Sequence, residues 1–436
     1  MSTIQKIKGT RDFFDLDAEK FRYIEQVCSN EIKKFGFKEM ITPIFENTAV
    51  FNRLGEQSDI VTKEMYTFFD RSNRSITLRP EGTAPVVRAF IENKIYANSI
   101  DVNKYFYFGP IFRYERPQAG RYRQFHQFGV EAFGNSTAIL DVDIILSAWT
   151  IIEKLNLQNI VLKINTIGDL SSRDKYQKAL VEYFNKYTDK LCNDCKVRLE
   201  KNPMRILDCK VDVNQDFMKN APKIKDYLSQ ESIDYFNEVL RGLDTFGIKY
   251  EIDENLVRGL DYYTDTVFEF IIKSDDELNN LAICAGGKYG NLVKDLNGPD
   301  IPGVGYAFGV ERLIELMDRQ NVWPSLKINP EIFIMALDEQ SKIEAQRLAL
   351  YLRKLGLKVE FDYKNISMKP QFRLLEKLNV EYILIIGENE RKENLITVKD
   401  VANKTQVTIP ISDLLNYLPY ELINAKEGFC YDENAQ

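Results

Sequence analysis

The stretch of residues 112–133 constrains the fold more strongly than any other part of the chain. Apolar residues alternate with polar ones on both sides of a segment that contains Pro117 and Gly120. Alternation in two runs separated by turn-forming residues is typical of antiparallel strands joined by a loop. We therefore predict a long β-hairpin over residues 112–133.

The second strand of this hairpin has two chemically different faces. Side chains two residues apart point to the same side of a strand, so Gln127 and Glu131 share a face. Gly129 lies between them and leaves room for something to lie there. The opposite face is apolar and consists of His126, Phe128, Val130 and Ala132. An exposed polar face is the alternative, but the flanking Phe125 and Phe133 favour the floor of a pocket.

Basic side chains gather next to this pocket face. Four arginines fall in the predicted first strand and loop, namely Arg113, Arg116, Arg121 and Arg123. A solvated charge cluster is the alternative, but Glu115 and the pocket face adjoin these arginines, and planar guanidinium groups suit phosphate oxygens. The only histidine, His126, lies on the apolar face, so we expect chemistry without a catalytic histidine.

Composition and charge limit the class of protein. The chain has 436 residues, of which 44% are hydrophobic and 28% charged, as in ordinary globular proteins. A net charge of −7 argues against nucleic-acid binding driven by the overall charge of the protein, although a local basic patch would suffice for recognition. We find no signal peptide and no apolar run near the roughly 20 residues of a membrane span. We expect a soluble, cytoplasmic protein with no membrane partner.

The cysteines leave one question open. Six cysteines in so long a chain fit a reducing compartment better than a disulfide scaffold. Cys192, Cys195 and Cys209 cluster in a way that invites a zinc site, with Asp208 or Asp212 as the fourth ligand because His126 is distant. Asp is the less usual ligand in structural zinc sites, so we expect three free thiols and no metal.

The pattern of elements divides the chain. Strand and helix signals fill residues 1–169, a charged segment with helical periodicity follows at 170–246, and strand signals return over 247–323. Residues 324–330 read as a linker. Beyond it, strands predicted at 332–336, 359–361 and 382–386 alternate with helices predicted at 341–355 and 370–378. This alternation predicts a separate α/β domain over residues 331–425.

Three segments resemble the signature motifs of class II aminoacyl-tRNA synthetases. Phe112–Glu115, followed by a loop and a second strand, resembles motif 2, and Gly305–Arg312 resembles motif 3. The segment around Pro43 matches the weaker motif 1, which builds the dimer interface in that family. All three motifs in the right order and well spaced make a specific signal.

Two further segments narrow the resemblance to the histidyl-tRNA synthetase family. Leu256–Tyr263 and Ala285–Leu292 are similar to the two histidine-specific motifs of that family, although Lys288 and Gly290 depart from its usual residues. We interpret Gly286–Gly287 as a tight turn that lets the backbone approach the histidine. The resemblance covers nearly the whole chain.

The resemblance implies an α+β fold in which a six-stranded antiparallel sheet with flanking helices carries the active site, formed by residues 1–169 and 247–323. The helical insertion at 170–246 would clamp the tRNA acceptor arm, and the α/β domain at 331–425 would bind the anticodon. The implied reaction activates L-histidine with ATP to histidyl-adenylate and transfers it to the 3′ end of tRNA(His), releasing pyrophosphate and AMP. The implied assembly is a homodimer through the motif 1 region.

The resemblance also implies roles for individual residues. The histidine site comprises Glu81, Gly82, Thr83, Arg113, Gln127, Glu131, Arg258, Tyr262, Tyr263 and Tyr289. The ATP site comprises Arg113, Glu115, Arg121, Phe125 and Arg312. Arg113 and Arg258 are the catalytic residues, because fixed positive charge stabilises the charge that develops on the α-phosphate. The tRNA acceptor end would meet Arg116, Gln118 and Arg123. ATP is expected with Mg²⁺, and no tightly bound cofactor is expected.

Two other functions compete with this one. A synthetase-like regulatory subunit of ATP phosphoribosyltransferase binds histidine as a sensor, but it resembles only the catalytic part. This chain continues through 331–425 and keeps Arg113, Arg258 and Arg312. A synthetase for threonine, proline or glycine has a similar C-terminal domain, but residues 256–263 argue against it.

Overall fold

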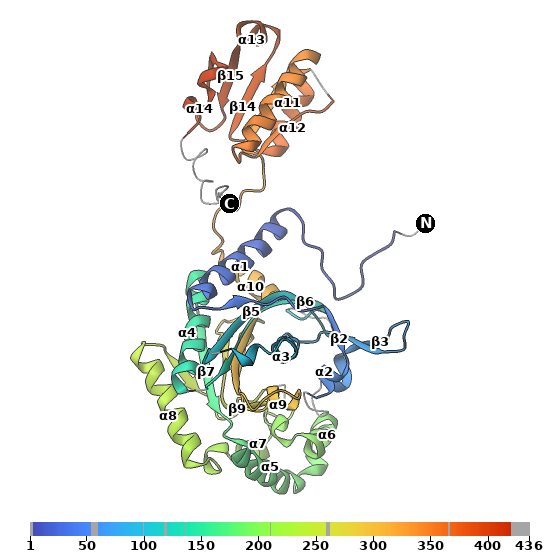
Figure 1. The fold of residues 1–436 in the computed structure, drawn as a ribbon, viewed down its shortest axis with the longest axis vertical. Coiled ribbons are helices and arrows are strands. Elements are labelled where there is room, and N and C mark those ends of the chain that lie inside the picture. The colour runs from blue at the N-terminus through green and yellow to red at the C-terminus, as the bar shows by residue number, and fades with distance from the viewer. Residues whose placement is uncertain are drawn as a thin grey trace. The chain divides into compact units, whose positions relative to one another are not determined.

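The computed structural model describes residues 3–53, 60–98, 100–116, 120–135, 137–209, 211–258, 262–364 and 367–419. The chain forms two compact units, Met1–Pro324 and Ser325–Gln436, each with its own hydrophobic core (Figure 1). Among the described residues, no helix is both long and apolar enough to cross a membrane. The finer domain limits given above stay predictions.

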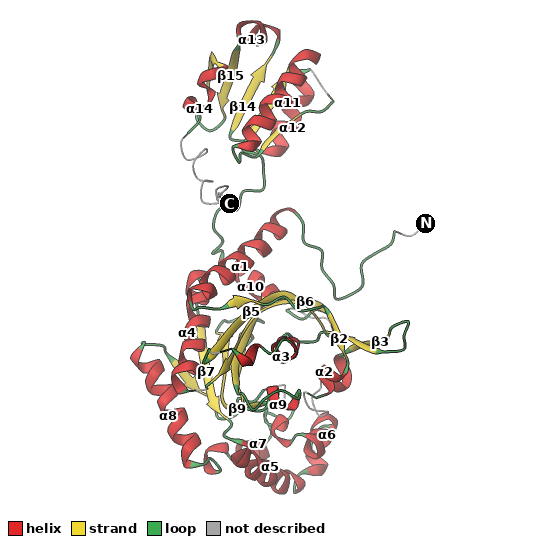
Figure 2. Cartoon of the chain, in the orientation of Figure 1, coloured by secondary structure: helices red, strands yellow, loops and turns green. Residues whose placement is uncertain are grey.

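A mixed eight-stranded sheet forms the centre of the first unit (Figure 2). Its strands in spatial order are β1 (Lys38–Glu39), β5 (Val102–Phe112), β6 (Gln124–Gly134), β11 (Gly303–Gly309), β10 (Ala282–Tyr289), β9 (Tyr263–Ile272), β7 (Ile160–Thr166) and β8 (Tyr250–Ile252). The middle strands, from β5 to β7, pair antiparallel. The short β1 and β8 add a parallel pair at each edge. The six-stranded antiparallel sheet is therefore confirmed, and two edge strands extend it.

The hairpin of β5 and β6 is longer than predicted and has a wider loop. Its strand pairing ends at Phe112. Further along, the backbone N–H of Tyr114 donates to the carbonyl of Glu64 (2.8 Å), and that of Arg123 donates to the carbonyl of Gly9 (2.7 Å). One hydrogen bond still crosses the hairpin beyond the ladder, from the backbone N–H of Arg113 to the carbonyl of Arg123 (2.9 Å), and the residues that follow are held by these tertiary contacts. All four arginines of this region therefore lie in the loop, and none lies on the first strand.

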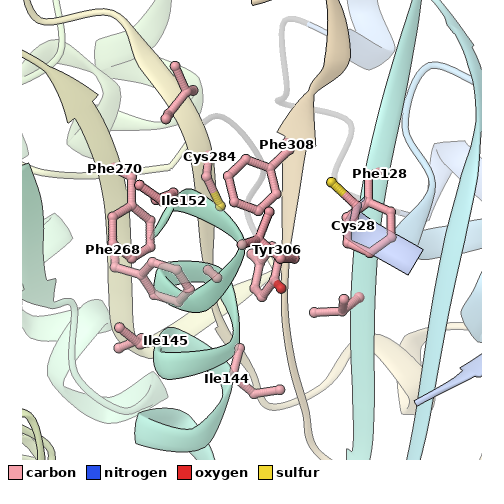
Figure 3. Packing of buried hydrophobic residues seen from close by; sticks show 14 of the residues in the cluster. Cys28, Phe128, Ile144, Ile145, Ile152, Phe268, Phe270, Cys284, Tyr306 and Phe308 are labelled. Carbon is pink, nitrogen blue, oxygen red and sulfur yellow. The ribbon is translucent and has the colours of Figure 1, made fainter. Parts of the chain in front are cut away.

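One face of the sheet is covered by α1 (Asp15–Lys34), α4 (Ala138–Lys154) and α10 (Val310–Gln320). Figure 3 shows aromatic side chains of the sheet, among them Phe268, Tyr306 and Phe308, in one buried cluster with Ile144 and Ile145 of α4. Phe128, Val130 and Ala132 of β6 are buried in this core, which confirms the face assigned by the two-residue period.

His126 belongs to the same face. Its Nδ1 lies 2.9 Å from a carboxylate oxygen of Glu311 in α10, and its ring packs edge-on against Phe21 of α1, with the centroids 4.7 Å apart. The histidine thus connects the sheet to two covering helices, as expected for a structural residue.

The opposite face carries shorter elements. They are α2 (Ala49–Asn52), α3 (Thr83–Glu92), α9 (Leu292–Asp295), the turns η1 (Ile60–Glu64) and η2 (Ile95–Ala97), and a small antiparallel sheet of β2 (Phe45–Asn47), β4 (Ser75–Leu78) and β3 (Tyr66–Phe69). Val86 and Phe90 of α3 pack in the second core cluster together with Phe133 of β6. This face is only partly covered, which leaves space for a site above the strands.

The segment between β7 and β8 is helical. It consists of α5 (Leu170–Asn185), η3 (Thr188–Lys190), α6 (Asn193–Lys201), η4 (Pro203–Ile206), α7 (Asp216–Lys219), η5 (Ile224–Asp226) and α8 (Gln230–Thr245). The side chain of Asp169 accepts the backbone N–H of Ser172, and that of Ser229 accepts the backbone N–H of Ser232. These N-caps explain where the two long helices begin.

The second unit is built on a five-stranded sheet. Its elements are β13 (Val359–Phe361), β12 (Ile332–Ala336), β14 (Tyr382–Ile386), β15 (Leu395–Asp400), β16 (Thr405–Pro410), α11 (Glu339–Lys354), α12 (Met368–Leu378), α13 (Glu388–Glu393), η6 (Ile411–Asp413) and α14 (Leu414–Tyr417). β13, β12 and β14 run parallel, as the alternation of strands and helices predicts, whereas the antiparallel β15 and β16 were not predicted. Helix α11 begins earlier than predicted because Asp338 accepts the N–H of Ser341 (2.9 Å).

Candidate active site

A cavity of about 240 Å³ lies on the partly covered face of the large sheet. The predicted residues that line it are Glu81, Thr83, Arg113, Glu115, Arg121, Phe125, Gln127, Arg258, Tyr262, Tyr263 and Arg312. The register explains why distant segments meet there: β6 and β11 pair Gln127 with Gly309 and Glu131 with Gly305. The strand pairing thus brings the loop of the hairpin and the start of α10 to one place.

Buried carboxylates dominate one end of this region. Glu81 is 4% exposed, and its oxygens accept the backbone N–H groups of Thr83 (2.8 Å) and Ala84 (2.7 Å) at the start of α3. Burial raises the pKa of Glu81, against the effect of these two hydrogen bonds. A carboxyl group in this position favours a cation as its partner.

Glu131 lies behind the cavity wall. It is 2% exposed; one oxygen accepts the hydroxyl of Thr83 (2.6 Å) and the other accepts the hydroxyl of Tyr289 (2.6 Å). Burial raises the pKa of Glu131 to about 8, although both hydrogen bonds oppose the rise. Glu131, Tyr289 and Gly82 are not among the residues that line the cavity, and their contact with histidine stays a prediction.

The space expected above Gly129 is filled. Tyr107 stands opposite Gly129 in the register of β5 and β6, and a Cβ at Gly129 or at Gly82 would collide with its ring. The glycines therefore make room for a neighbouring side chain, and the ligand lies beyond Tyr107. The prediction of an open pocket floor at Gly129 was wrong, because the two-residue period says nothing about the next strand.

The other end of the cavity is rich in arginine. Arg113 donates from Nε to the carbonyl of Pro80 (2.8 Å), and its guanidinium lies over the Phe125 ring, 5.3 Å from the centroid. Arg258 forms an ion pair with Glu269 and lies over the Tyr263 ring, 5.5 Å from the centroid.

In the described part of the chain, the hydrogen bonds of the Arg312 side chain go only to backbone carbonyl oxygens. Its guanidinium donates to the carbonyls of Gly120 (3.1 Å) and Ala282 (2.6 Å). Burial lowers the pKa of Arg312, and so do the charges of Arg121 and Arg113. This accumulation of positive charge suits an anionic ligand.

Tyr107, Glu269 and Cys284 are among the lining residues that escaped the sequence analysis. Glu269 interrupts the apolar strand Thr266–Ile272, and an isolated charge inside such a strand was a usable signal for a buried ionic partner. Tyr107 and Cys284 carry no such signal, because a tyrosine or cysteine in a strand is ordinary core material.

Of the residues predicted to meet the tRNA, Arg116 and Arg123 are not among those that line the cavity. Arg116 is exposed, and Gln118 lies outside the described residues. Arg123 donates to the carbonyl of Glu115 (3.4 Å) and lies over the Tyr114 ring, 4.5 Å from the centroid. Arg121 reaches the cavity and lies 3.3 Å from a carboxylate oxygen of Glu115.

The second histidine-specific segment has a different local structure from the one predicted. Gly286 and Gly287 lie inside β10 rather than in a tight turn. A Cβ at either position would meet the carbonyl oxygen of an adjacent strand, Gly305 or Thr266. Glycine is therefore needed for close packing between strands. Lys288 is not among the residues that line the cavity, and its ammonium group pairs with Asp265 (3.0 Å).

A family comparison agrees with this geometry. Residues 9–313 match the model of the histidyl-tRNA synthetase family, and residues 331–420 match the model of an anticodon binding domain. The match to the first model covers more than half of the chain, and it contains every element that lines the cavity.

Alignments with individual relatives cover nearly the whole chain. A histidine–tRNA ligase of Bacillus subtilis is 43% identical over 412 residues, 94% of this chain and 97% of that protein. The structure of apo Staphylococcus aureus histidyl-tRNA synthetase superimposes with a TM-score of 0.81 at 37% identity, covering 95% and 99% of the two chains. An ATP phosphoribosyltransferase regulatory subunit/histidyl-tRNA synthetase of Bacillus halodurans shares the fold, with a TM-score of 0.66 at 18% identity, covering 89% and 99%.

Proposed function

The chain belongs to the histidyl-tRNA synthetase family and is a histidine–tRNA ligase. On this basis we propose which residues bind histidine, which bind ATP and which bind tRNA. The reaction joins L-histidine to ATP, releases pyrophosphate, and passes the histidyl group to the 3′ end of tRNA(His) with release of AMP. The observation that carries the proposal is one cavity with buried carboxylates at one end and arginines at the other. An amino acid with a free ammonium group suits the first end, and a triphosphate suits the second.

Histidine binds at the carboxylate end. Glu81 and Gln127 face the α-ammonium group together with Thr83, whose hydroxyl keeps acceptor capacity while it donates to Glu131. The bound ammonium supplies a positive charge close to the buried Glu81 carboxylate. Gly82 contributes by allowing Tyr107 to pack closely against the start of α3.

The imidazole ring lies between Glu131 and Tyr263, with Tyr262 and Tyr289 beside it. Each oxygen of Glu131 keeps a second lone pair after accepting from Thr83 and Tyr289, and an imidazole N–H can use it after a small shift of the wall. A site that satisfies both ring nitrogens rejects ligands that leave its own polar groups unpaired.

ATP binds at the arginine end. Arg113 and Arg258 face the α-phosphate, Arg312 faces the γ-phosphate, and Phe125 stacks on adenine with Glu115 and Arg121 nearby. Arg113 covers one face of the Phe125 ring, which leaves the other face for the base. As the histidine carboxylate attacks the α-phosphate, negative charge grows there, and the fixed guanidinium groups stabilise it.

ATP enters with a divalent cation in this family, and we assign Mg²⁺. The cavity offers carboxylate oxygens of Glu115 and Glu269, which are the hard donors that Mg²⁺ prefers. When bound, the ion neutralises part of the phosphate charge. The chemistry assigned here needs no tightly bound cofactor.

Pyrophosphate exchange tests the assignment. The full-length protein should catalyse ATP–pyrophosphate exchange with histidine and with none of the other nineteen standard amino acids. Histidine binding without any exchange would instead favour a non-catalytic histidine sensor.

The tRNA would meet three regions. Arg116, Gln118 and Arg123 of the hairpin loop face its acceptor end, the helical insertion clamps the acceptor arm, and the second unit binds the anticodon. The match of residues 331–420 to an anticodon binding domain supports the last assignment. A chain cut after Pro330 should form histidyl-adenylate but charge tRNA poorly. Charging as fast as that of the full-length chain would contradict the anticodon role.

We also propose a cytoplasmic homodimer through the motif 1 region. Ile41, Phe45 and Phe69 are 84%, 57% and 67% exposed, an unusual group of large apolar side chains on the surface around β2 and β3. Ile41→Asp should yield monomers in light scattering. Ile139→Asp, at an equally apolar exposed position of α4, is the matched control and should remain dimeric.

A further inference from the structure

Three thiols and one carboxylate meet inside the helical insertion, far along the chain from the catalytic residues. Cys192 immediately precedes α6, Cys195 lies in its first turn, and Cys209 and Asp212 lie between η4 and α7. One ligand atom from each of these four residues lies within 4.8 Å of the other three. We call these four residues the Cys₃Asp cluster.

The structure decides which aspartate belongs to the cluster. Asp212 is 2% exposed, accepts the backbone N–H of Cys192 (3.1 Å) and donates its own N–H to Sγ of Cys209 (3.4 Å). The side chain of Asp208 is 60% exposed and lies 3.7 Å from Arg205. Of the two aspartates that the sequence offered as a fourth ligand, Asp212 is the one that lies beside the three thiols.

The spacing of the sulfur atoms fits a metal better than a disulfide. Sγ of Cys192 and Sγ of Cys209 are 3.7 Å apart. Two thiolates bound to one tetrahedral zinc ion at about 2.3 Å each would lie about 3.8 Å apart. A disulfide requires a sulfur–sulfur distance of about 2.05 Å. The cysteines are free, and the sulfur atoms of Cys192 and Cys209 already have the separation of two zinc ligands.

The surroundings also favour a cation. Cys195 and Cys209 are 0% and 4% exposed and pack in an apolar cluster with Leu199, Ile206 and Phe217. A buried charge is costly unless it is both hydrogen-bonded and paired with an opposite charge. Asp212 already accepts a hydrogen bond from the backbone of Cys192, so the pairing positive charge is what a metal ion would add. Zinc would supply that charge and would join α6 to the segment before α7, where the regular elements are only a few residues long.

We propose that the Cys₃Asp cluster binds one Zn²⁺ ion that stabilises the helical insertion. The site is structural, because all four positions of the tetrahedron are occupied by protein ligands. The inference rests on the geometry of the insertion and is independent of the residue roles assigned in the catalytic cavity.

Metal analysis of the full-length protein tests the proposal. Protein purified without chelators, and dialysed after addition of zinc, should contain about one zinc per chain by inductively coupled plasma mass spectrometry. Cys195→Ser and Asp212→Asn should lower this content. Cys28→Ala is the matched control, because Cys28 is equally buried but lies in α1, and it should retain the metal. A chain that takes up no zinc, or a Cys195→Ser variant that keeps it fully, overturns the proposal.

Cobalt substitution makes the test independent of any variant. Co²⁺ bound to the wild-type protein should show an intense thiolate-to-cobalt charge-transfer band in the near ultraviolet, and zinc should displace it. Cobalt binding without that band would show that the thiols are not ligands. A non-reducing mass lower by two hydrogens, mapped to Cys192 and Cys209, would show that a disulfide takes the place of the metal and would also overturn the proposal.

Discussion

The two ends of the catalytic cavity differ in how many of their charged groups already have hydrogen-bond or ion-pair partners within the protein. At the carboxylate end, Glu81 and Glu131 each accept two hydrogen bonds from their own unit. At the arginine end, Arg258 has an anionic partner, whereas Arg312 donates to carbonyl oxygens and lies close to other guanidinium charges. The first end is largely complete before a ligand arrives, and the second retains an excess of positive charge.

We therefore expect the carboxylate end to determine which amino acid binds and the arginine end to determine the rate of the reaction with ATP. A preformed, buried polar network selects a ligand that matches it, because a wrong ligand leaves groups unpaired. An excess of fixed positive charge acts most strongly on charge that develops during the reaction. Substitutions at the arginine end should therefore reduce the rate for every step on ATP, whereas those at the carboxylate end should affect the use of histidine.

The largest effect is expected at Arg258. Arg258→Ala removes one electrostatic stabiliser of the α-phosphate, a loss of about 3–4 kcal/mol or roughly 10²–10³ in rate. Pyrophosphate exchange at saturating ATP and histidine measures it. Because the substitution leaves Glu269 without its ionic partner, the double variant Arg258→Ala/Glu269→Gln is the control for folding. Exchange that recovers to the wild-type rate in the double variant would contradict a catalytic role.

A smaller loss is expected at Glu131. Glu131→Gln keeps the shape but removes a charge-assisted hydrogen bond to the imidazole, worth about 1.5–3 kcal/mol or roughly 10–10² in kcat/KM for histidine. The KM for ATP should stay unchanged, because the residue lies at the other end. An equal rise in the KM for ATP would show that the two ends are not separable in this way.

Substitutions in the hairpin loop should affect only the transfer of the histidyl group to tRNA, and not the formation of histidyl-adenylate. Arg123→Ala and Gln118→Ala should slow single-turnover transfer from preformed adenylate about tenfold, the loss of one good contact to a base or phosphate. Exchange should hardly change. Arg71→Ala, at an exposed arginine between β3 and β4, is the control for a general loss of positive charge. Loop variants that damage exchange as severely as Arg258→Ala would refute the division of labour.

The smallest expected effect is the release of less than one proton per protein when histidine binds. Burial raises the pKa of Glu131 to about 8, so the free enzyme holds this carboxyl group mostly protonated at pH 7. An imidazole N–H stabilises the ionised form, lowers that pKa, and releases the proton on binding. Calorimetry of histidine binding in buffers of different ionisation enthalpy should show this release at pH 7. The Glu131→Gln variant should lose it and retain only the proton change of histidine itself.

Much of the fold could be predicted because it depends on local periods. The two-residue period placed Phe128, Val130 and Ala132 in the core and Gln127 on the side of the site. The strands Ile332–Ala336 and Tyr382–Ile386 were predicted with their observed bounds, because both are continuous apolar runs in a parallel sheet. The charged residues of motifs 2 and 3 also indicated a phosphate-binding chemistry before any contact was known.

The tertiary structure decided everything that depends on which segments become neighbours. Strand pairing placed Tyr107 over Gly129 and put Gly286 and Gly287 inside a strand. The packing of the helical insertion brought Asp212 rather than Asp208 to the three cysteines. The ion pair of Arg258 with Glu269 likewise depends on the packing of a loop against β9. Local sequence sets which side of its own strand or helix a residue faces. What lies opposite that side is set by long-range pairing, whose partners no local period encodes.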